Sequence, residues 1–566
     1  MISSAVQLGV VLTFLSVTTT SQGLNHEGWL LLALKKQMVD TLHYLDDWNP
    51  MDPFPCEWNG VYCSSGSKMA VVSLDLSNMN LSGTVDPSIC GLAKLTNLDL
   101  SFNVFFGVIP AEIGNCSKLE VLNLNVNNFQ GTIPHELGKL AMLTNLDMSF
   151  NGFSGVIPEE IGNCSKLEIL NLNDNNFLGT TPRELGKLAM MTNLDLSFNR
   201  FSGIILEEIG NCSKMEVLNL DVNNFLGMIP PELGKLAMLT NLDLSFNGFS
   251  GVIPEEIGNC LKLKVLNLND NNFLGTIPPE LGKLAMLTNL DLSFNGFSGI
   301  IPEEIGNCSK LEVLNLNDNN FLGTIPPELG KLAMLTNLNM SFNEFSGVIP
   351  KEIGNCSKLE VLNLKNNNFL GTIPHELGKL AMLTNLNLSF NGFFGVIPKE
   401  IGNCSKLEVL NLNDNNFLGT IPLELGKLAM LTAFNLYNNK LHGAIPNEIG
   451  NMTSLEDLVG YINNLSGSIP RSIGRLKNLK TFRLGRNAIS GNIPVEIGEC
   501  LNLVVFGLAL NKLGGPLPKE IGKLSLMNRL ILWGNKLSGV IPVEIRNCTD
   551  LTIISLRDNN LVGLIP

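Results

Sequence analysis

The stretch CSKLEVLNLNVNNFQGTIPHELGK, from Cys116 to Lys139, decides the fold of this chain. Leu122 and Leu124 lie two residues apart, so both side chains point to one face of a short strand, whereas Asn123 and Asn125 point to the other face. The remaining apolar residues of the stretch close a core from the other sides, and its Gly and Pro residues predict tight turns that end strand pairing. One such coil cannot bury its own apolar side, so the stretch predicts a stack of coils.

An Asn recurs every 24 residues, as from Asn103 to Asn127, and marks equivalent positions in consecutive coils. Its amide has two donors and one acceptor, with which it can satisfy backbone groups in the turns of neighbouring coils. The loss of such a buried partner costs about 1–3 kcal/mol. Twenty complete repeats run from residue 68, and a twenty-first starts at 548 and stops at 566. The predicted Asn ladder comprises Asn103, Asn127, Asn151, Asn175, Asn199, Asn223, Asn247, Asn271, Asn295, Asn319, Asn343, Asn367, Asn391, Asn415, Asn439, Asn463, Asn487, Asn511, Asn535 and Asn559.

The composition and the first residues indicate an exported protein. The net charge of −14 over 566 residues opposes a nucleic-acid partner, because phosphate binding needs a basic surface. Residues 5–17 form an apolar run followed by small polar residues, which predicts a signal peptide over residues 1–23. No apolar stretch of bilayer length follows residue 23, so we expect no membrane segment in this chain.

Over residues 68–566 the pattern LxxLxxLxLxxNxFxGxIPxELG resembles the plant-specific leucine-rich repeat, and residues 24–67 resemble its N-terminal cap. In that cap Leu30, Leu34 and Met38 lie at helical spacing. Two cysteines seven residues apart, which flank a tight Gly turn in an exported chain, predict a disulfide between Cys56 and Cys63. The resemblance implies an α/β solenoid: a right-handed, curved superhelix with a parallel β-sheet on its concave side, mostly loop and 3-10 turns on its convex side, and a helical, disulfide-linked N-terminal cap.

The whole chain is similar to the ectodomains of plant leucine-rich-repeat receptor-like kinases. The resemblance implies a receptor that binds an extracellular peptide or protein ligand on the concave face and then pairs with a shorter leucine-rich-repeat co-receptor kinase. It implies a secreted location, or the plasma-membrane surface where a longer product carries a membrane helix. In the family, a second Cys cap, a membrane helix and a Ser/Thr kinase follow the repeats. We expect none of them in this chain and assign it no enzymatic activity.

Two other functions remain open from the sequence. Similar repeats also build secreted inhibitors of cell-wall-degrading enzymes, although such inhibitors are shorter and fully capped. The near-identical repeats and the incomplete last one are also compatible with a non-functional, truncated duplicate.

The predicted ligand site lies in the last third of the chain. From about residue 92 to 431 two repeats alternate almost unchanged, and no Trp or Tyr falls between residues 63 and 436. Trp, Tyr and Arg dominate binding hot spots, and Arg can bind a peptide carboxylate through two parallel hydrogen bonds. Outward-pointing strand positions of the late repeats, and one residue beside them, therefore form the predicted ligand site: Tyr437, Tyr461, Arg483, Arg486, Arg529, Trp533 and Arg557.

The cysteines of the repeats recur in every second coil. Two coils correspond to about 10 Å of stacking, whereas a disulfide needs Cα atoms within about 7 Å of each other. We therefore interpret them as small buried apolar residues and predict neither a disulfide ladder nor a metal site. Cys90 lies outside this phase and receives no role. The five scattered His residues form no metal or catalytic pattern, and nothing in the sequence indicates a cofactor. The in-phase residues are Cys116, Cys164, Cys212, Cys260, Cys308, Cys356, Cys404, Cys500 and Cys548.

Two further recurring features concern the surface. A Phe precedes the ladder Asn in alternate repeats, and we predict that it packs at the strand margin rather than forming a binding stripe, because large apolar groups are usually buried. These residues are Phe102, Phe150, Phe198, Phe246, Phe294, Phe342 and Phe390. Export also makes the N-glycosylation motifs candidate glycan sites. They are Asn80, Asn115, Asn163, Asn211, Asn307, Asn339, Asn355, Asn387, Asn403, Asn451, Asn464 and Asn547.

Overall fold

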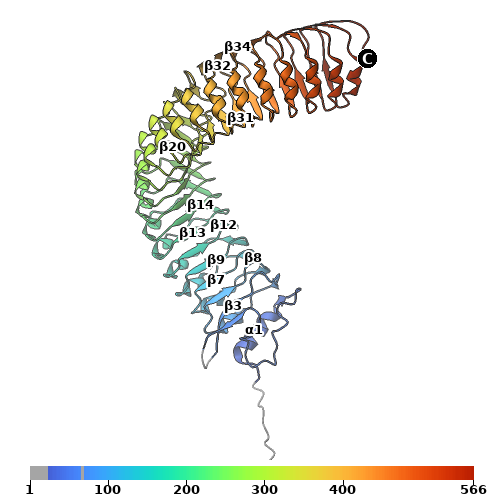
Figure 1. Cartoon of the computed structure of the whole chain (residues 1–566). Helices are drawn as coiled ribbons and strands as arrows, with labels where there is room; N and C mark the ends of the chain where they lie inside the picture. Colours follow the sequence, from blue (N-terminus) through green and yellow to red (C-terminus); the bar gives the residue numbers. More distant parts are fainter. Residues whose placement is uncertain (1–22, 66–68) are drawn as a thin grey trace, which may run out of the picture. The chain divides into compact units, whose positions relative to one another are not determined.

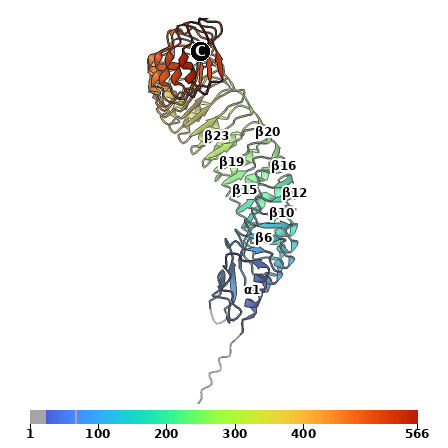
Figure 2. The ribbon, with the colours of Figure 1, turned by 90° about the vertical axis from the view of Figure 1, so that its right-hand side faces the viewer.

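The computed structural model describes residues 23–65 and 69–566, and these described residues divide between two compact units with the bounds Met1–Ser154 and Gly155–Pro566. The predicted signal peptide over residues 1–23 lies outside the described residues apart from its last position. Figures 1 and 2 show the ribbon of the chain from two sides, coloured from blue at the N-terminus to red at the C-terminus.

Helix α1 (His26–Lys36) forms the cap of the first unit. The side chain of Asn25 accepts a hydrogen bond from the backbone N of Gly28 at 2.8 Å and so satisfies one free donor of the first turn. Leu34 is buried, as the helical spacing requires. The prediction that this apolar spacing extends to Met38 is wrong, because the helix ends at Lys36 and Met38 pairs with Gly83 in a short antiparallel ladder.

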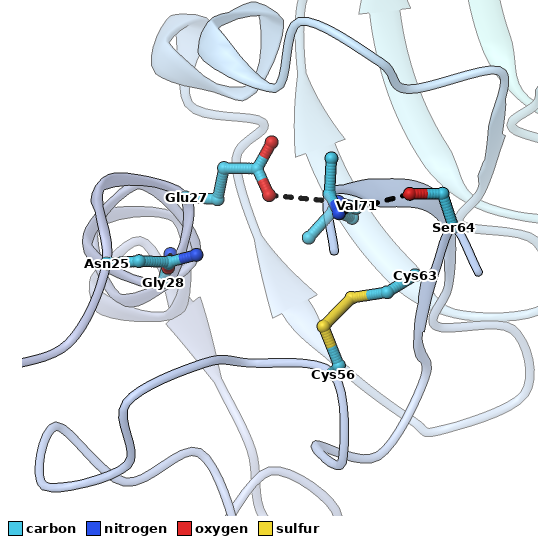
Figure 3. The surroundings of a disulfide bond; sticks show 8 residues. Asn25, Glu27, Gly28, Cys56, Cys63, Ser64 and Val71 are labelled. Carbon is cyan, nitrogen blue, oxygen red and sulfur yellow. Dashed lines mark hydrogen bonds between the residues drawn. A yellow bond between two sulfur atoms is a disulfide. The ribbon is translucent and has the colours of Figure 1, made fainter. Parts of the chain in front are cut away.

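The predicted Cys56–Cys63 disulfide is present, with a Cα–Cα distance of 5.4 Å (Figure 3). It closes the loop that leads into strand β2 (Val61–Cys63), which runs antiparallel to β3 (Val71–Asp75). Figure 3 also shows the side chain of Glu27 in α1 accepting a hydrogen bond from the backbone N of Val71 at 2.9 Å. The cap is thus fastened to the first strand of the repeat sheet.

A second disulfide joins Cys90 to Cys116, whose Cα atoms lie 4.7 Å apart. Cys116 is buried, as predicted, but the interpretation that it is an apolar filler without a disulfide is wrong. The sequence separation of the two cysteines is one coil plus two positions, so they face each other across adjacent coils. The remaining in-phase cysteines are buried and form no disulfide in the described residues, as predicted: Cys164, Cys212, Cys260, Cys308, Cys356, Cys404, Cys500 and Cys548.

The rest of the first unit already shows the repeat. Strands β5 (Asn97–Asp99), β7 (Val121–Asn123) and β9 (Asn145–Asp147) continue from β3 in parallel. A second row of strands lies on the other side of the coils: β1 (Met38–Val39), β4 (Ser82–Gly83), β6 (Val104–Gly107), β8 (Asn128–Gly131) and β10 (Gly152–Gly155). Short 3-10 turns η1 (Pro87–Gly91), η2 (Ala111–Asn115) and η3 (His135–Lys139) complete the coils.

In the second unit each coil contributes one short strand to a parallel sheet. Each strand pairs in register with the equivalent residues of the next coil, for example Leu194 with Leu218. The strands are β11 (Ile169–Asn171), β13 (Asn193–Asp195), β15 (Val217–Asn219), β17 (Asn241–Asp243), β19 (Val265–Asn267), β21 (Asn289–Asp291), β23 (Val313–Asn315), β25 (Asn337–Asn339), β27 (Val361–Asn363), β29 (Asn385–Asn387), β31 (Val409–Asn411), β33 (Ala433–Asn435), β35 (Asp457–Val459), β37 (Thr481–Arg483), β39 (Val505–Gly507), β41 (Arg529–Ile531) and β43 (Ile553–Ser555).

The second row of strands in this unit is interrupted in places and follows the ladder Asn. Its strands are β12 (Asn176–Gly179), β14 (Arg200–Gly203), β16 (Asn224–Gly227), β18 (Gly248–Gly251), β20 (Asn272–Gly275), β22 (Gly296–Gly299), β24 (Asn320–Phe321), β26 (Ser346–Gly347), β28 (Asn368–Phe369), β30 (Phe394–Gly395), β32 (Asn416–Gly419), β34 (Lys440–Ala444), β36 (Asn464–Ser466), β38 (Ser490–Asn492), β40 (Lys512–Gly515), β42 (Lys536–Gly539) and β44 (Asn560–Leu561).

The 3-10 turns of the second unit carry the Glu-Ile-Gly or Glu-Leu-Gly motif in most coils. They are η4 (Glu159–Asn163), η5 (Arg183–Lys187), η6 (Glu207–Asn211), η7 (Pro231–Lys235), η8 (Glu255–Asn259), η9 (Pro279–Lys283), η10 (Glu303–Asn307), η11 (Pro327–Lys331), η12 (Lys351–Asn355), η13 (His375–Lys379), η14 (Lys399–Asn403), η15 (Leu423–Lys427), η16 (Asn447–Asn451), η17 (Arg471–Arg475), η18 (Val495–Glu499), η19 (Lys519–Lys523) and η20 (Val543–Asn547). A Cβ on Gly306 would lie 2.5 Å from the carbonyl oxygen of Glu328, so this Gly allows adjacent coils to approach closely.

The ladder Asn side chains tie adjacent coils together. Nδ2 of Asn199 donates to the carbonyl oxygen of Leu172 in the preceding coil at 2.9 Å and to those of Leu196 and Ser197 in its own coil. Its Oδ1 accepts from the backbone N of Phe177 at 3.0 Å. Asn199 is buried, so these contacts satisfy backbone groups that water does not reach. The predicted fold class, a solenoid with a parallel sheet and 3-10 turns, is confirmed.

The prediction that the Phe residues before the ladder Asn pack at the strand margin is wrong. Phe198 is 51% exposed, and Phe246 and Phe294 are 48% and 50% exposed. Each occupies a left-handed backbone conformation, with φ of 51° at Phe198, which turns its ring away from the core. The stacked rings inside the coils belong instead to the Phe two residues after the ladder Asn, such as Phe201 and Phe225 at 6.2 Å.

Candidate functional site

A hollow of about 280 Å³ opens on the solvent side of the parallel sheet in the late repeats. It lies where strands β35, β37, β39 and β41 end. We call it the C-terminal hollow; its lining residues are Tyr461, Ile462, Arg483, Gly485, Arg486, Gly507, Ala509, Leu510, Ile531 and Trp533.

The floor of the C-terminal hollow is made of small residues at positions where other repeats carry larger ones. Gly485 and Ala509 occupy one outward column between Tyr461 and Trp533, and Gly507 lies in the neighbouring column at the end of β39. In the column of Tyr461 and Trp533, two consecutive coils therefore lack a bulky side chain, and the depression between the two aromatic residues follows directly from this.

Two stacked tyrosines and an arginine form one wall. The rings of Tyr437 and Tyr461 lie 4.7 Å apart at an interplanar angle of 3°, and the guanidinium carbon of Arg483 lies 5.0 Å from the centroid of the Tyr461 ring. Burial, together with the carboxylate of Asp414, raises the pKa of Tyr437 to about 12. The tyrosine therefore stays neutral at physiological pH, and the wall carries the positive charge of Arg483.

Trp533 forms the opposite wall, and the guanidinium carbon of Arg557 lies 4.6 Å from its ring centroid. Such a cation over an indole face contributes about 0.5–1 kcal/mol at an exposed site. Both walls are thus aromatic rings already supported by a neighbour in the next or preceding coil. Such support reduces the conformational entropy that a ligand would have to remove on binding.

Arg483 and Arg486 give the C-terminal hollow its electrostatic character. Arg483 ends β37, and Arg486 occupies the left-handed position before ladder residue Asn487, with φ of 54°. Both are exposed, and within residues 23–65 and 69–566 no carboxylate oxygen lies within 4.0 Å of either guanidinium group. Two other arginines of the late repeats have such partners: Arg471 lies 3.9 Å from Glu496, and Arg557 lies 3.9 Å from Asp558. Two uncompensated guanidinium groups beside an uncharged floor favour an anion.

The structure thus brings four of the seven predicted ligand residues into one hollow: Tyr461, Arg483, Arg486 and Trp533. Tyr437 and Arg557 support its walls from behind, whereas Arg529 begins β41 and does not line it. The floor residues were not predicted. The sequence does contain a sign of them, because two consecutive repeats lack the Asn, Asp or Ser that other repeats carry at these outward positions. Small residues, however, are not typical of binding hot spots.

Larger hollows lie on the opposite side of the coils, at the 3-10 turns, and their lining residues give no comparable indication of a ligand site. One of about 1000 Å³ is lined by Pro374, Pro398 and Pro422 with adjoining Glu and Lys residues. A second, of about 530 Å³, is lined by the equivalent residues around Pro302 and Pro326. Because the same Ile-Pro-x-Glu segment recurs in most coils, these hollows are a property of the repeat rather than of one site.

The glycosylation motifs fall into two groups. Those at Asn80 and Asn464, and those at Asn115, Asn163 and their copies at the ends of 3-10 turns, are exposed. Asn339 and Asn387 are half-buried in the sheet, where their side chains accept hydrogen bonds from the hydroxyls of the serines two residues later at 2.8 and 2.7 Å. We expect glycans at the exposed motifs and none at Asn339 or Asn387, which mass spectrometry of the secreted chain would test.

Comparisons with known proteins agree with this architecture. Residues 24–64 match the leucine rich repeat N-terminal domain family, and residues 285–345 and successive segments between 94 and 452 match leucine rich repeat families. The Arabidopsis receptor kinase HAESA, solved in complex with the peptide hormone IDA and the co-receptor SERK1, is 35% identical, with a TM-score of 0.78 over 96% of this chain and 95% of that one. The chain belongs to the leucine-rich-repeat ectodomains of plant receptor kinases.

Other relatives support the same family. The plant peptide hormone receptor RGFR1, solved in complex with RGF2, is 33% identical, with a TM-score of 0.79 over 89% of this chain and 92% of that one. A probable leucine-rich-repeat receptor-like protein kinase of Arabidopsis thaliana is 44% identical over 108 residues, which make up 18% of this chain and 10% of that protein. The matched stretch is thus about a tenth of this curated relative's length.

The described part of this leucine-rich-repeat ectodomain contains no helix of the length and apolar character needed to span a bilayer. In the same residues no group of three or more His, Cys, Asp or Glu side chains is arranged to hold a metal ion.

Proposed function

We propose that this leucine-rich-repeat ectodomain binds an extracellular peptide through a carboxylate held in the C-terminal hollow. The observation that carries the proposal is the pair Arg483 and Arg486, which faces an uncharged floor and has no carboxylate within 4.0 Å in the described residues. A guanidinium group binds a carboxylate through two parallel, charge-assisted hydrogen bonds. The rings of Tyr461 and Trp533 offer apolar surfaces for the adjoining side chains of such a peptide.

The similar proteins support a receptor rather than an inhibitor of wall-degrading enzymes. The two solved relatives described above are a receptor kinase in complex with a peptide hormone and a co-receptor, and a peptide hormone receptor in complex with its ligand. We infer an extracellular or cell-surface location for this chain by analogy. We also infer that its ligand-bound form pairs with a shorter leucine-rich-repeat co-receptor.

The experiment compares peptides that differ only in their terminal charge. Residues 24–566 would be secreted from a eukaryotic host and screened against a library of short peptides with free C-terminal carboxylates. Each peptide that binds would then be titrated against its C-terminal amide. We expect amidation and Arg483→Ala each to weaken binding about a hundredfold, since a charge-assisted hydrogen bond contributes about 1.5–3 kcal/mol.

Arg529→Ala is the matched control, because Arg529 is an exposed arginine of the same sheet that does not line the hollow. This variant should bind within about twofold of the unmodified chain, which is the range of an energetically neutral surface change. Equal binding of acids and amides, or equal loss in the Arg529 and Arg483 variants, would contradict the proposal. Co-receptor pairing would be tested by size-exclusion chromatography with a short leucine-rich-repeat ectodomain, which should co-elute only when the peptide is present.

A further inference from the structure

The exposed Phe residues of the second unit form a stripe that the C-terminal hollow does not use. Phe198, Phe246, Phe294, Phe342 and Phe390 are 42–51% exposed, and they occupy the same position of every second coil. Their φ angles lie between 50° and 54°, so each Cα–Cβ bond leaves the backbone in the same direction. We call these five residues the Phe stripe.

The spacing of the Phe stripe restricts the shape of a ligand that could follow it. Strands lie about 4.7–4.9 Å apart, so rings two coils apart repeat about every 9.6 Å. A polyproline II helix repeats every three residues, or about 9.3 Å, whereas an α-helix presents equivalent side chains every seven residues, or about 10.5 Å. Over four intervals the polyproline helix falls about 1 Å out of step and the α-helix about 3.6 Å. An extended strand, with same-face side chains about 6.6–6.8 Å apart, does not match.

We call the space between two consecutive rings of the Phe stripe an interval. One interval already holds a cation. The Lys365 ammonium lies 4.9 Å from the ring centroid of Phe342 and 5.7 Å from that of Phe390. It therefore sits between two consecutive rings of the stripe, where each ring face attracts positive charge. The residue that follows Lys365 is Asn366, which is neutral.

The two preceding intervals lack the lysine and carry a carboxylate instead. Asn269 and Asn317 stand where Lys365 stands, and Asp270 and Asp318 stand where Asn366 stands. Both aspartates are exposed. Each of these intervals thus offers two ring faces and a negative charge without an internal cation, which is the arrangement that Lys365 fills in its own interval.

We propose that the Phe stripe binds a cationic polyproline II segment, with Lys or Arg side chains of the partner seated between Phe246 and Phe294 and between Phe294 and Phe342. Asp270 and Asp318 supply the opposing charges. The ligand is recognised by its threefold period and positive charge, because the prolines of such a segment fix its helix before binding and lower the entropic cost. This surface is separate from the C-terminal hollow and does not depend on the function proposed for it.

The test uses the secreted chain and fluorescently labelled synthetic peptides. The probe is (Lys-Pro-Pro)6, and the controls are (Glu-Pro-Pro)6 and an alanine-rich helical 21-mer with Lys at every seventh position. Fluorescence anisotropy should show binding of the probe, at least tenfold weaker binding of the helical peptide and none of the acidic one. Binding of the helical peptide as tight as that of the probe, or binding of the acidic peptide, would overturn the proposal.

Variants locate the surface. Phe294→Ala removes the ring shared by both open intervals and should weaken probe binding about tenfold. Leu274→Ala, which removes a 56% exposed apolar side chain of β20, should change probe binding less than twofold.

The double variant Lys365→Asn with Asn366→Asp should strengthen binding at least threefold by opening a third interval. Equal effects of Phe294→Ala and Leu274→Ala, or no gain in the double variant, would overturn the proposal. Because Phe294, Leu274 and Asn366 are exposed and Lys365 is half-buried outside the core, circular dichroism should remain that of the parent chain.

Discussion

The copied repeats, over residues 164–431, and the late repeats, over residues 433–566, share one scaffold and differ in what they show to solvent. Both have the same short strands in register, the same ladder Asn and the same 3-10 turns. At the outward position where β37 ends in Arg483, the copied repeat at β23 has Asn315. Gly485 likewise stands where a copied repeat has Asn317. The comparison teaches that separate positions of the repeat unit determine the scaffold and its surface, so a binding site can arise without loss of the core.

The largest effect should come from the shared scaffold and should be equal in both regions. Nδ2 of Asn319 donates to the carbonyl oxygen of Leu292 in the preceding coil at 2.9 Å and to carbonyl oxygens of its own coil, and Asn511 makes the equivalent contact to Leu484 at 2.9 Å. Asn319→Ala and Asn511→Ala each leave several buried backbone groups unpaired and should destabilise the surrounding coils by about 3 kcal/mol. Hydrogen exchange of the flanking strands measures this locally.

A matched control for these variants is Asn320→Ala, which changes an exposed Asn next to the ladder position. It should alter the exchange of the same strands by less than about 0.5 kcal/mol. If Asn319→Ala and Asn511→Ala differed by more than this, the idea of one scaffold with two surfaces would fail.

The second-largest expected effect distinguishes the late repeats from the copied repeats. Ala509→Asn places in the floor of the C-terminal hollow the polar side chain that Asn317 provides in the copied repeats. Its backbone already carries a Cβ, so the fold should tolerate the change while the hollow fills. We expect about tenfold weaker peptide binding, which corresponds to about 1.4 kcal/mol. The reciprocal variant, Asn317→Ala, should leave binding unchanged, and isothermal titration calorimetry distinguishes the two outcomes.

A smaller effect is expected behind the wall of the hollow. Arg557 touches Trp533 rather than the hollow itself, so Arg557→Ala removes support without removing a contact surface. The loss of an exposed cation–π contact of about 0.5–1 kcal/mol should weaken peptide binding about threefold. Arg557→Lys keeps the charge over the ring and should restore most of the affinity. A hundredfold loss in the alanine variant would mean that Arg557 contacts the ligand directly.

The fold could be predicted because the repeat period and its residue pattern are enough to determine it. Leucines two residues apart, one ladder Asn in each coil and a Pro after most strands specify strand, ladder and turn without reference to distant sequence. The candidate residues Tyr461, Arg483 and Trp533 could be predicted as well, because they depart from a nearly uniform background in residue type and in outward orientation.

What escaped prediction depends on three-dimensional relations that a repeat pattern does not contain. The Cys90–Cys116 disulfide joins residues one coil plus two positions apart, whereas the periodic argument compared only cysteines two coils apart. The exposure of Phe198 follows from a left-handed backbone angle that residue type does not reveal. The floor made by Gly485 and Ala509 is visible only when consecutive coils are laid side by side.

The smallest effect at neutral pH concerns the buried thiols, which both regions share. Burial raises the pKa of Cys308 in the copied repeats and of Cys500 in the late repeats to about 11, from an ordinary value of 9.0. At pH 8 the thiolate fraction is then about one in a thousand, so native chains should resist iodoacetamide in both regions and react fully once unfolded. Because the folded state keeps these protons to a higher pH than the unfolded state does, their contribution to stability is constant below about pH 9 and falls as the pH rises to about 11. Rapid labelling of native Cys308 but not of native Cys500 at pH 8 would show that the copied coils open more readily than the late ones, and it would contradict a scaffold common to both.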